Sequence, residues 1–315
     1  IAELVGIRRL APGGGASLIS SEPAYHLSWD GELLWAVQRH GICALSPDGR
    51  VRMEIPANTF ISFDPSRTRV CGIVPRTACV VDSLDAEGIE RVRSWAALVR
   101  ADLSASKPLV DVFHEERVAD RALDLSWIGR VQVADAEPSA RVLVGNRKHS
   151  RLQLLDPVRR IATYLPHRYP DAPLFVRWGT KLLMAHGNRN RQNRANLVVI
   201  HEMLEAPQPF MNLGSWEHVG WDGRYVLSPY YQAGAVHGRY LHLIAGRLAY
   251  PEWTVVDLAN LRVRVGRLGE ARNDGSDVEA LVDSPRHGLL AIKNGAPYRV
   301  VMPPFEELPP LPQKP

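Results

Sequence analysis

Basic side chains gather in several short polar stretches of the sequence, where they could bind anions. The richest stretch is 186–194, in which His186, Arg189, Arg191 and Arg194 are interleaved with Asn, Gly and Gln. The planar guanidinium group of arginine suits bidentate contacts to carboxylates and phosphates. Comparable stretches contain Arg39 and His40, Arg76, Arg147 with Lys148 and His149, and Lys293. We predict that these residues bind an anionic group.

Three of these candidates are histidines, which exchange protons near neutral pH. His40, His149 and His186 could therefore supply acid–base chemistry while neighbouring arginines bind an anionic or carbohydrate substrate. The sequence contains no Gly-x-Ser-x-Gly, His-Glu-x-x-His, phosphate-loop or Cys-x-x-Cys motif. We therefore favour a protein that is not an enzyme, and we assign no catalytic residue and no cofactor.

Histidines are also frequent in one part of the chain, which raises the question of a metal site. Five of the 11 histidines are His186, His201, His218, His237 and His242. Their spacings are not those of a metal motif, so no metal ligand is assigned. His201 and His242 fall within predicted strands, where a packed or a surface histidine is the ordinary interpretation.

The elements that must position the basic stretches form a repeat. One kind of segment is an apolar run, a turn such as Asp30-Gly31, and a second apolar run; a second kind follows it, as in residues 44–51. Asp-Gly and Asp-Pro between apolar runs are typical of hairpins. The first kind begins near residues 24, 60, 122, 173, 216 and 278, which predicts about six four-stranded antiparallel units. Residues 224–267 contain extra strand-like sequence, so seven units is the alternative.

Such a repeat resembles the β-propeller class, in the broad style of YVTN and quinoprotein-like blades. The resemblance identifies no particular family. It implies an all-β fold with a single propeller over residues 1–302, whose ring is closed by the N-terminal strand at residues 5–12. Loops that join second to third strands lie on one face of a propeller, so we expect the basic stretches to create one positive surface.

Two segments depart from the repeat. Ile89, Val92, Ala96, Val99 and Leu103 share a face at helical spacing, so residues 86–104 are predicted to be an inserted helix, with residues 105–121 as the connection back. The alternative is an outer strand at residues 89–95 followed by a long loop. The Pro-rich tail at residues 303–315 is expected to be extended and partly disordered.

Composition limits the class of protein. With 315 residues, 45% of them hydrophobic, the chain is long and apolar enough for a core, and no apolar run is long enough for a membrane helix. Three cysteines make a disulfide framework improbable and favour a reducing, cytoplasmic location. If the chain turns at Pro75-Arg76, Cys71 and Cys79 face each other on adjacent strands, most simply as two buried thiols.

The net charge of +4 is modest, and only five of the 38 basic residues are lysines. Dense basic clusters, which a nucleic-acid binder usually has, are missing. The leading hypothesis is a non-catalytic binding or scaffold module whose basic loop face meets an acidic protein partner; a small anion would fit the same face. An enzyme and a nucleic-acid contact are the alternatives, and no membrane partner is expected. Asn, Gly and Arg are also common surface-turn residues, so the bias could be without function.

Overall fold

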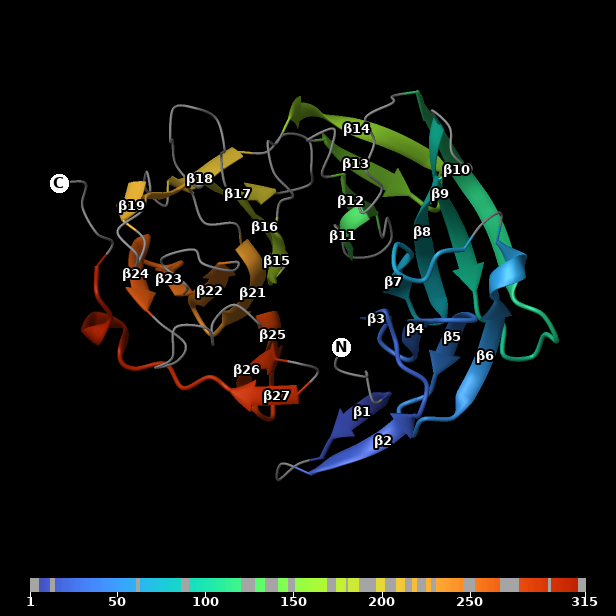
Figure 1. The fold of residues 1–315 in the computed structure, drawn as a ribbon, viewed down its shortest axis with the longest axis horizontal. Coiled ribbons are helices and arrows are strands. Elements are labelled where there is room, and N and C mark those ends of the chain that lie inside the picture. Colours follow the sequence, from blue (N-terminus) through green and yellow to red (C-terminus); the bar gives the residue numbers. More distant parts are fainter. Residues whose placement is uncertain are drawn as a thin grey trace. The chain divides into compact units, whose positions relative to one another are not determined.

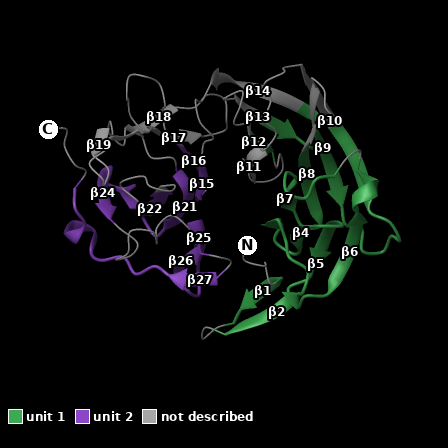
Figure 2. Cartoon of the chain, viewed as in Figure 1, with its two compact units in different colours: residues 1–168 green, residues 169–315 purple. Residues whose placement is uncertain are grey.

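The structure is a computed structural model, and the description is confined to part of the chain. The residues described are 6–11, 15–60, 63–85, 91–119, 128–133, 141–146, 151–168, 174–179, 181–186, 197–201, 208–212, 217–219, 225–227, 231–245, 253–266, 278–293 and 296–310. Their regular secondary structure is almost entirely β-strand, with two short 3-10 turns (Figure 1). The chain divides into unit 1, residues 1–168, and unit 2, residues 169–315 (Figure 2).

Unit 1 contains three four-stranded antiparallel sheets and one hairpin. The hairpin pairs β1 (Ile7–Leu10) with β2 (Ala16–Ser20). The first sheet is β3 (His26–Trp29), β4 (Leu34–Gln38), β5 (Gly41–Leu45) and β6 (Val51–Pro56). The second is β7 (Arg69–Val74), β8 (Thr77–Asp85), β9 (Arg91–Arg100) and β10 (Leu109–Ala119). The third is β11 (Ile128–Val133), β12 (Val142–Asn146), β13 (Arg151–Asp156) and β14 (Ile161–Arg168).

Unit 2 contains two four-stranded sheets, one three-stranded sheet and one hairpin. The four-stranded sheets are β15 (Leu174–Trp178), β16 (Lys181–His186), β17 (Leu197–His201) and β18 (Gln208–Asn212), and β21 (Tyr231–His237), β22 (Tyr240–Ala245), β23 (Trp253–Asp257) and β24 (Arg262–Gly266). The three-stranded sheet is β25 (Val278–Ser284), β26 (Gly288–Lys293) and β27 (Ala296–Arg299), and the hairpin is β19 (Glu217–Val219) with β20 (Tyr225–Leu227).

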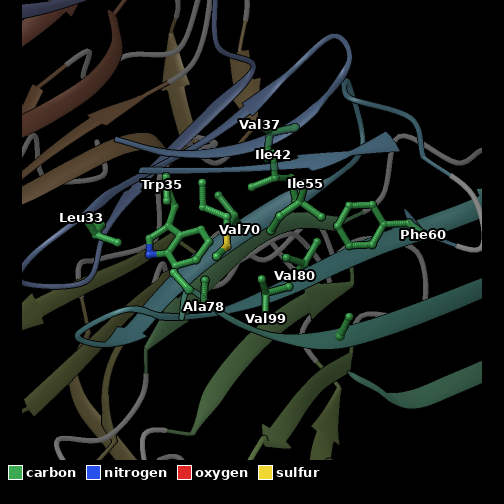
Figure 3. Packing of buried hydrophobic residues seen from close by; sticks show 14 of the residues in the cluster. Leu33, Trp35, Val37, Ile42, Ile55, Phe60, Val70, Ala78, Val80 and Val99 are labelled. Atoms are coloured by element: carbon green, nitrogen blue, oxygen red, sulfur yellow. The ribbon is translucent and has the colours of Figure 1, made fainter. Parts of the chain in front are cut away.

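The sheets are the blades of a β-propeller arrangement. Within each sheet the strands follow chain order, and the first strands of the three- and four-stranded sheets contact one another: β3 with β7 and β7 with β11 in unit 1, β15 with β21 and β21 with β25 in unit 2. The hydrophobic core lies between blades. Figure 3 shows one such layer, in which Trp35 and Ile55 of the first sheet pack with Val80 and Val99 of the second.

Polar side chains of β3 tie the first blade to the second. The backbone N–H groups of Val70 and Gly72 donate to His26 Nδ1 (3.3 Å) and Ser28 Oγ (2.8 Å). Asp30 completes the series, because its carboxylate accepts from the Arg76 N–H (2.8 Å) in the next blade. Since β7 is the edge strand of its sheet, these contacts satisfy backbone donors that have no strand partner.

Asp30 also organises its own blade. Its Oδ1 atom accepts from the Leu33 N–H (2.7 Å), which closes the β3–β4 turn, and its Oδ2 atom accepts from the Trp35 indole N–H (2.7 Å). Gly72 leaves room for this arrangement, because a Cβ atom there would lie 2.7–2.9 Å from atoms of Asp30. The residue therefore links a turn, a core tryptophan and the neighbouring blade.

The predicted hairpin chemistry is confirmed in the first blade and at two later turns. Gly31 and Gly49, which end the Asp-Gly pairs, have φ angles of +101° and +86°. In unit 1 the Asp156 carboxylate accepts from the backbone two and three residues ahead, and in unit 2 Asp257 does the same. The two aspartates thus form equivalent turns in different blades, as the repeat predicted.

The predicted set of six or seven complete four-stranded blades is wrong. The described residues form five four-stranded sheets, one sheet of three strands and two sheets of two. The unit expected to begin near residue 216 is the hairpin β19–β20, and the sheet after it begins at Tyr231. Closure of a ring by the N-terminal strand is not confirmed: among the ladders described, the partner of β1 is β2.

The predicted helix at residues 86–104 and connection at 105–121 are also wrong, because Arg91–Arg100 is strand β9 and Leu109–Ala119 is strand β10. The apolar run is buried from both sides: Trp95, Ala97 and Val99 pack toward the first blade, and Ala96 packs toward the third. A strand buried on both faces loses the alternation that marks a half-exposed strand, so its apolar residues also fit helical spacing.

Two smaller expectations had different outcomes. Cys71 and Cys79 are directly opposed in the β7–β8 ladder as buried thiols that form no disulfide, as predicted, and burial raises the pKa of Cys79. The expected extended, partly disordered tail is wrong for residues 303–310, where Phe305 and Leu308 are buried in the core of unit 2. Residues 311–315 lie outside the part of the chain that is described.

The contacts of Asp30 predict a large effect of its removal. In Asp30→Ala, the Trp35 indole and the Leu33 N–H lose their acceptor in the interior, and each such orphaned donor costs about 1–3 kcal/mol. We expect the free energy of unfolding of unit 1 to fall by about 3 kcal/mol or more in urea titrations. The control is Asp48→Ala in the exposed β5–β6 turn, which should cost below about 1 kcal/mol. Equal losses in the two variants would contradict the role given to Asp30.

Candidate functional site

The turn between β4 and β5 carries Arg39 and His40, two of the predicted binding residues. Both side chains are exposed, and neither forms an ion pair with a described residue. The backbone around them is fixed: the His40 carbonyl accepts from the Ala57 N–H at 2.8 Å. Gly41 follows with φ +151°, and a Cβ atom there would lie 2.1 Å from the Ile55 carbonyl oxygen. The turn thus presents its basic side chains from a rigid base.

Arg76 does not belong with Arg39 and His40. It lies in the β7–β8 turn, and its guanidinium group pairs with Glu32 of the β3–β4 turn at 2.8 Å. This hydrogen bond raises the pKa of Arg76 and lowers that of Glu32. Because successive turns of a meander lie at opposite ends of the strands, Arg76 is at the other end of the blades from Arg39.

The wrong position predicted for Arg76 follows from the assignment of one strand. Residues 60–63 were interpreted as the first strand of the second blade, but Phe60 and Phe63 are packed core aromatics, and Phe60 stacks on Trp95 at 5.2 Å. The first strand is β7, so the Pro75-Arg76 turn joins first to second strands rather than second to third. The expectation that Arg76 shares the basic face is therefore wrong.

The other candidates are described only in part. His186 ends β16 and Lys293 ends β26, so both enter connections from second to third strands in unit 2. The remaining ones, Arg147, Lys148, His149, Arg189, Arg191 and Arg194, lie outside the described residues. The chain order nevertheless puts residues 147–150 between β12 and β13, the same connection as Arg39 and His40 in the first blade.

This end of unit 1 is not uniformly basic. The connection from second to third strand in the second blade is residues 86–90, between β8 and β9, and it contains Glu87 and Glu90. An acidic connection therefore stands in chain order between two basic ones. The sequence of this connection therefore differs in charge from those of the two basic connections.

Two of the described histidines are shielded from water within the blades: His242 is buried and His26 is half-buried. Besides accepting from Val70, His26 is desolvated and lies near Arg69, which together lower its pKa from 6.5 to about 4. His242 of β22 accepts from the Trp253 indole N–H at 3.3 Å, and burial lowers its pKa to about 4 as well. His242 is therefore a packed strand histidine, which is one of the two interpretations that the sequence left open.

A group of arginines and aromatic rings in unit 2 was missed by the sequence analysis. The buried carboxylate of Asp257 pairs with Arg239 (3.1 Å), and Glu306 pairs with Arg262 and Arg264. The ring of Phe305 stacks on Tyr240 at 5.3 Å. The alternating Arg-Val-Arg at 262–264 and the Phe-Glu-Glu within the Pro-rich tail were the available signals.

Within the described part of the chain, no group of three or more His, Cys, Asp and Glu side chains could hold a metal ion. No helix among those residues is long and apolar enough to span a membrane.

The sequence matches no family model and no curated protein. The structure is similar to the extracellular domain of a protein described as a hybrid two-component system from Bacteroides thetaiotaomicron, with a TM-score of 0.56, 11% identity and coverage of 91% of this chain and 36% of that chain. It is also similar to the β-propeller domain of Cps50 (Swd1) from Myceliophthora thermophila, with a TM-score of 0.52, 14% identity and coverage of 89% and 83%. At such identities the likeness shows the β-propeller fold alone.

The lowered pKa values of His26 and His242 predict an acid-sensitive stability. Each is neutral in the folded protein down to about pH 4, whereas the unfolded side chain takes up a proton below about pH 6.5. Their contribution is therefore complete above pH 6.5 and is lost as the pH falls toward 4, by roughly 3 kcal/mol per histidine.

The measurement is proton uptake on urea unfolding at about pH 5, compared between the original chain and His26→Gln. We expect the variant to take up about one proton fewer, and no difference between the two chains at about pH 8. Equal uptake at the lower pH would show that His26 is already protonated in the fold.

Proposed function

We propose that the chain is a non-catalytic binding module that offers basic loops at one end of its blades to an acidic protein partner. The observation that carries the proposal is the exposed pair Arg39 and His40, which has no ion pair with any residue described and stands on a rigid turn. Arg147, Lys148 and His149 follow in the equivalent connection of the third blade. The charge of Arg39, which no described residue compensates, attracts acidic surfaces.

In unit 2 the corresponding connections begin at His186 and Lys293, and the first of them contains Arg189, Arg191 and Arg194. These residues belong to the proposal as a second basic set. Arg76 is left out, since its charge is compensated by Glu32.

The test compares two sets of substitutions in unit 1 that remove the same charge from opposite ends of the blades. The first variant is Arg39→Gln, Arg147→Gln and Lys148→Gln. The control is Arg76→Gln, Arg100→Gln and Arg159→Gln, at turns from first to second or from third to fourth strands. The probe is a fluorescent glutamate-rich peptide, and binding is followed by anisotropy over a range of salt concentrations.

We expect the first variant to weaken binding about tenfold and to flatten the dependence of the affinity on salt, and the control to change it less than about twofold. Equal losses in both variants would show that net charge, not this end of the blades, attracts the peptide. Tighter binding of an oligonucleotide of equal charge would replace the proposal by the nucleic-acid alternative. No binding of either probe would overturn it.

A further inference from the structure

The last described residues of the chain occupy a defined place on the outer strand of a blade in unit 2. This C-terminal segment, residues 303–310, runs along β24, where the Val265 N–H donates to the Pro309 carbonyl at 2.9 Å and Arg264 forms an isolated bridge with Pro310. The segment contains prolines at 303, 304, 309 and 310, which have no N–H group. It therefore cannot form a regular fifth strand, and side chains must contribute most of its attachment.

The aromatic contact is specific. Phe305 is 4% exposed and stacks on Tyr240 with ring centroids 5.3 Å apart and an interplanar angle of 21°. The guanidinium carbons of Arg262 and Arg264 lie 5.3 Å and 5.9 Å from the centroid of the Phe305 ring. The two arginines alternate along β24, so both side chains project from one face of the strand. One ring is thus held by another ring and two cations.

The acidic contact follows in the next residue. Glu306 accepts hydrogen bonds from Arg262 at 2.5 Å and 3.2 Å and from Arg264 at 3.3 Å. These bonds lower the pKa of Glu306 and raise that of Arg262. Without Glu306, the guanidinium groups of Arg239, Arg262 and Arg264 would have the buried carboxylate of Asp257 as their compensating charge. If the whole segment left, Arg262 and Arg264 would carry excess positive charge beside the ring of Tyr240, which Phe305 no longer covered.

We propose that Tyr240, Arg262 and Arg264 form a docking site for a linear segment of a partner protein in which an aromatic residue precedes an acidic one, and that the C-terminal segment occupies this site in competition with that partner. The ion pair is open to exchange, because the Arg262 and Glu306 side chains are 44% and 60% exposed and water and salt weaken their attraction. Phe305 and Leu308 are buried in the core of unit 2, so both must leave that core when the segment is displaced. The site lies in unit 2 and does not depend on the basic loops of the proposed function.

The experiment uses the full chain and a fluorescent peptide with the sequence of residues 301–310. In the double variant Phe305→Ala/Glu306→Ala the site is vacated, whereas in the original chain the tethered segment competes at a high effective concentration. We expect the peptide to bind the double variant at least about tenfold more tightly than the original chain. Adding Arg262→Ala and Arg264→Ala to the double variant should lower the affinity about tenfold again, and the matched control Arg286→Ala, an exposed arginine in the β25–β26 turn, should leave it unchanged.

An alanine scan of the peptide then tests the recognised motif. We expect the largest losses at the aromatic and first acidic positions, and small losses at the flanking prolines. Losses concentrated at the prolines would overturn the proposal, as would failure of the peptide to bind the folded double variant, or equal binding to the original chain. If the double variant does not fold, the single variant Glu306→Lys, which keeps the buried Phe305, replaces it. The peptide should bind this variant more tightly than it binds the original chain, and an unchanged affinity would overturn the proposal.

Discussion

The first strand of each described blade has one edge that pairs with no other strand, and the structure depends on how the backbone N–H and C=O groups along that edge find hydrogen-bond partners. Between the first two blades of unit 1, His26 and Ser28 of β3 and Asp30 just after it accept hydrogen bonds from the first strand and first turn of the second blade. Unit 2 uses the same device with other residues: the Gln232 amide of β21 donates to the Val278 carbonyl of β25, and His237 pairs with Asp283. Polar links between first strands therefore set the spacing and register of neighbouring blades, and apolar packing fills the layer behind them.

The same geometry explains where sequence reasoning succeeds and fails. Turns such as Asp30-Gly31 and the aspartate turns at 156 and 257 depend on local chemistry, so they could be predicted from a few residues. Strand β9 could not, because its two faces are buried against two different blades and its apolar residues lose their alternation. The assignment of strands to blades failed for a related reason. Phe60 and Phe63 are residue types that favour strands, yet they pack against the core before β7 begins. Assigning them to a strand shifted the second blade by one strand and placed Arg76 at the wrong end of it.

The residues of the candidate sites likewise divide into those that local sequence could place and those that depend on tertiary contacts. That Arg39 and His40 would lie on an exposed turn followed from the hairpin around them. That Arg76 would be neutralised by Glu32 could not be foreseen, since the two residues are 44 positions apart and meet only because Asp30 joins their turns. The cluster around Phe305 depends likewise on a contact between β22, β24 and the C-terminal segment, which no local pattern specifies. Charges alone therefore mark candidates, and tertiary pairing decides which of them remain available.

The pairing of opposite charges differs between the two ends of the blades within each unit. At the end with the turns from first to second strand, two of the described arginines are paired: Arg76 with Glu32 in unit 1, and Arg239 with Asp257 in unit 2. These pairs bridge neighbouring turns, so a ligand there would have to displace a contact that also orders the fold. Arg39 and His40 have no such duty, and an anion could approach them without that loss. The charges of Arg262 and Arg264 at the Phe305 site are compensated less firmly than that of Arg76 and more than that of Arg39, because the Glu306 carboxylate belongs to a proline-rich segment with few backbone hydrogen bonds. A partner there replaces one set of contacts with an equivalent set, so its affinity is governed by the difference between the two ligands rather than by the site alone.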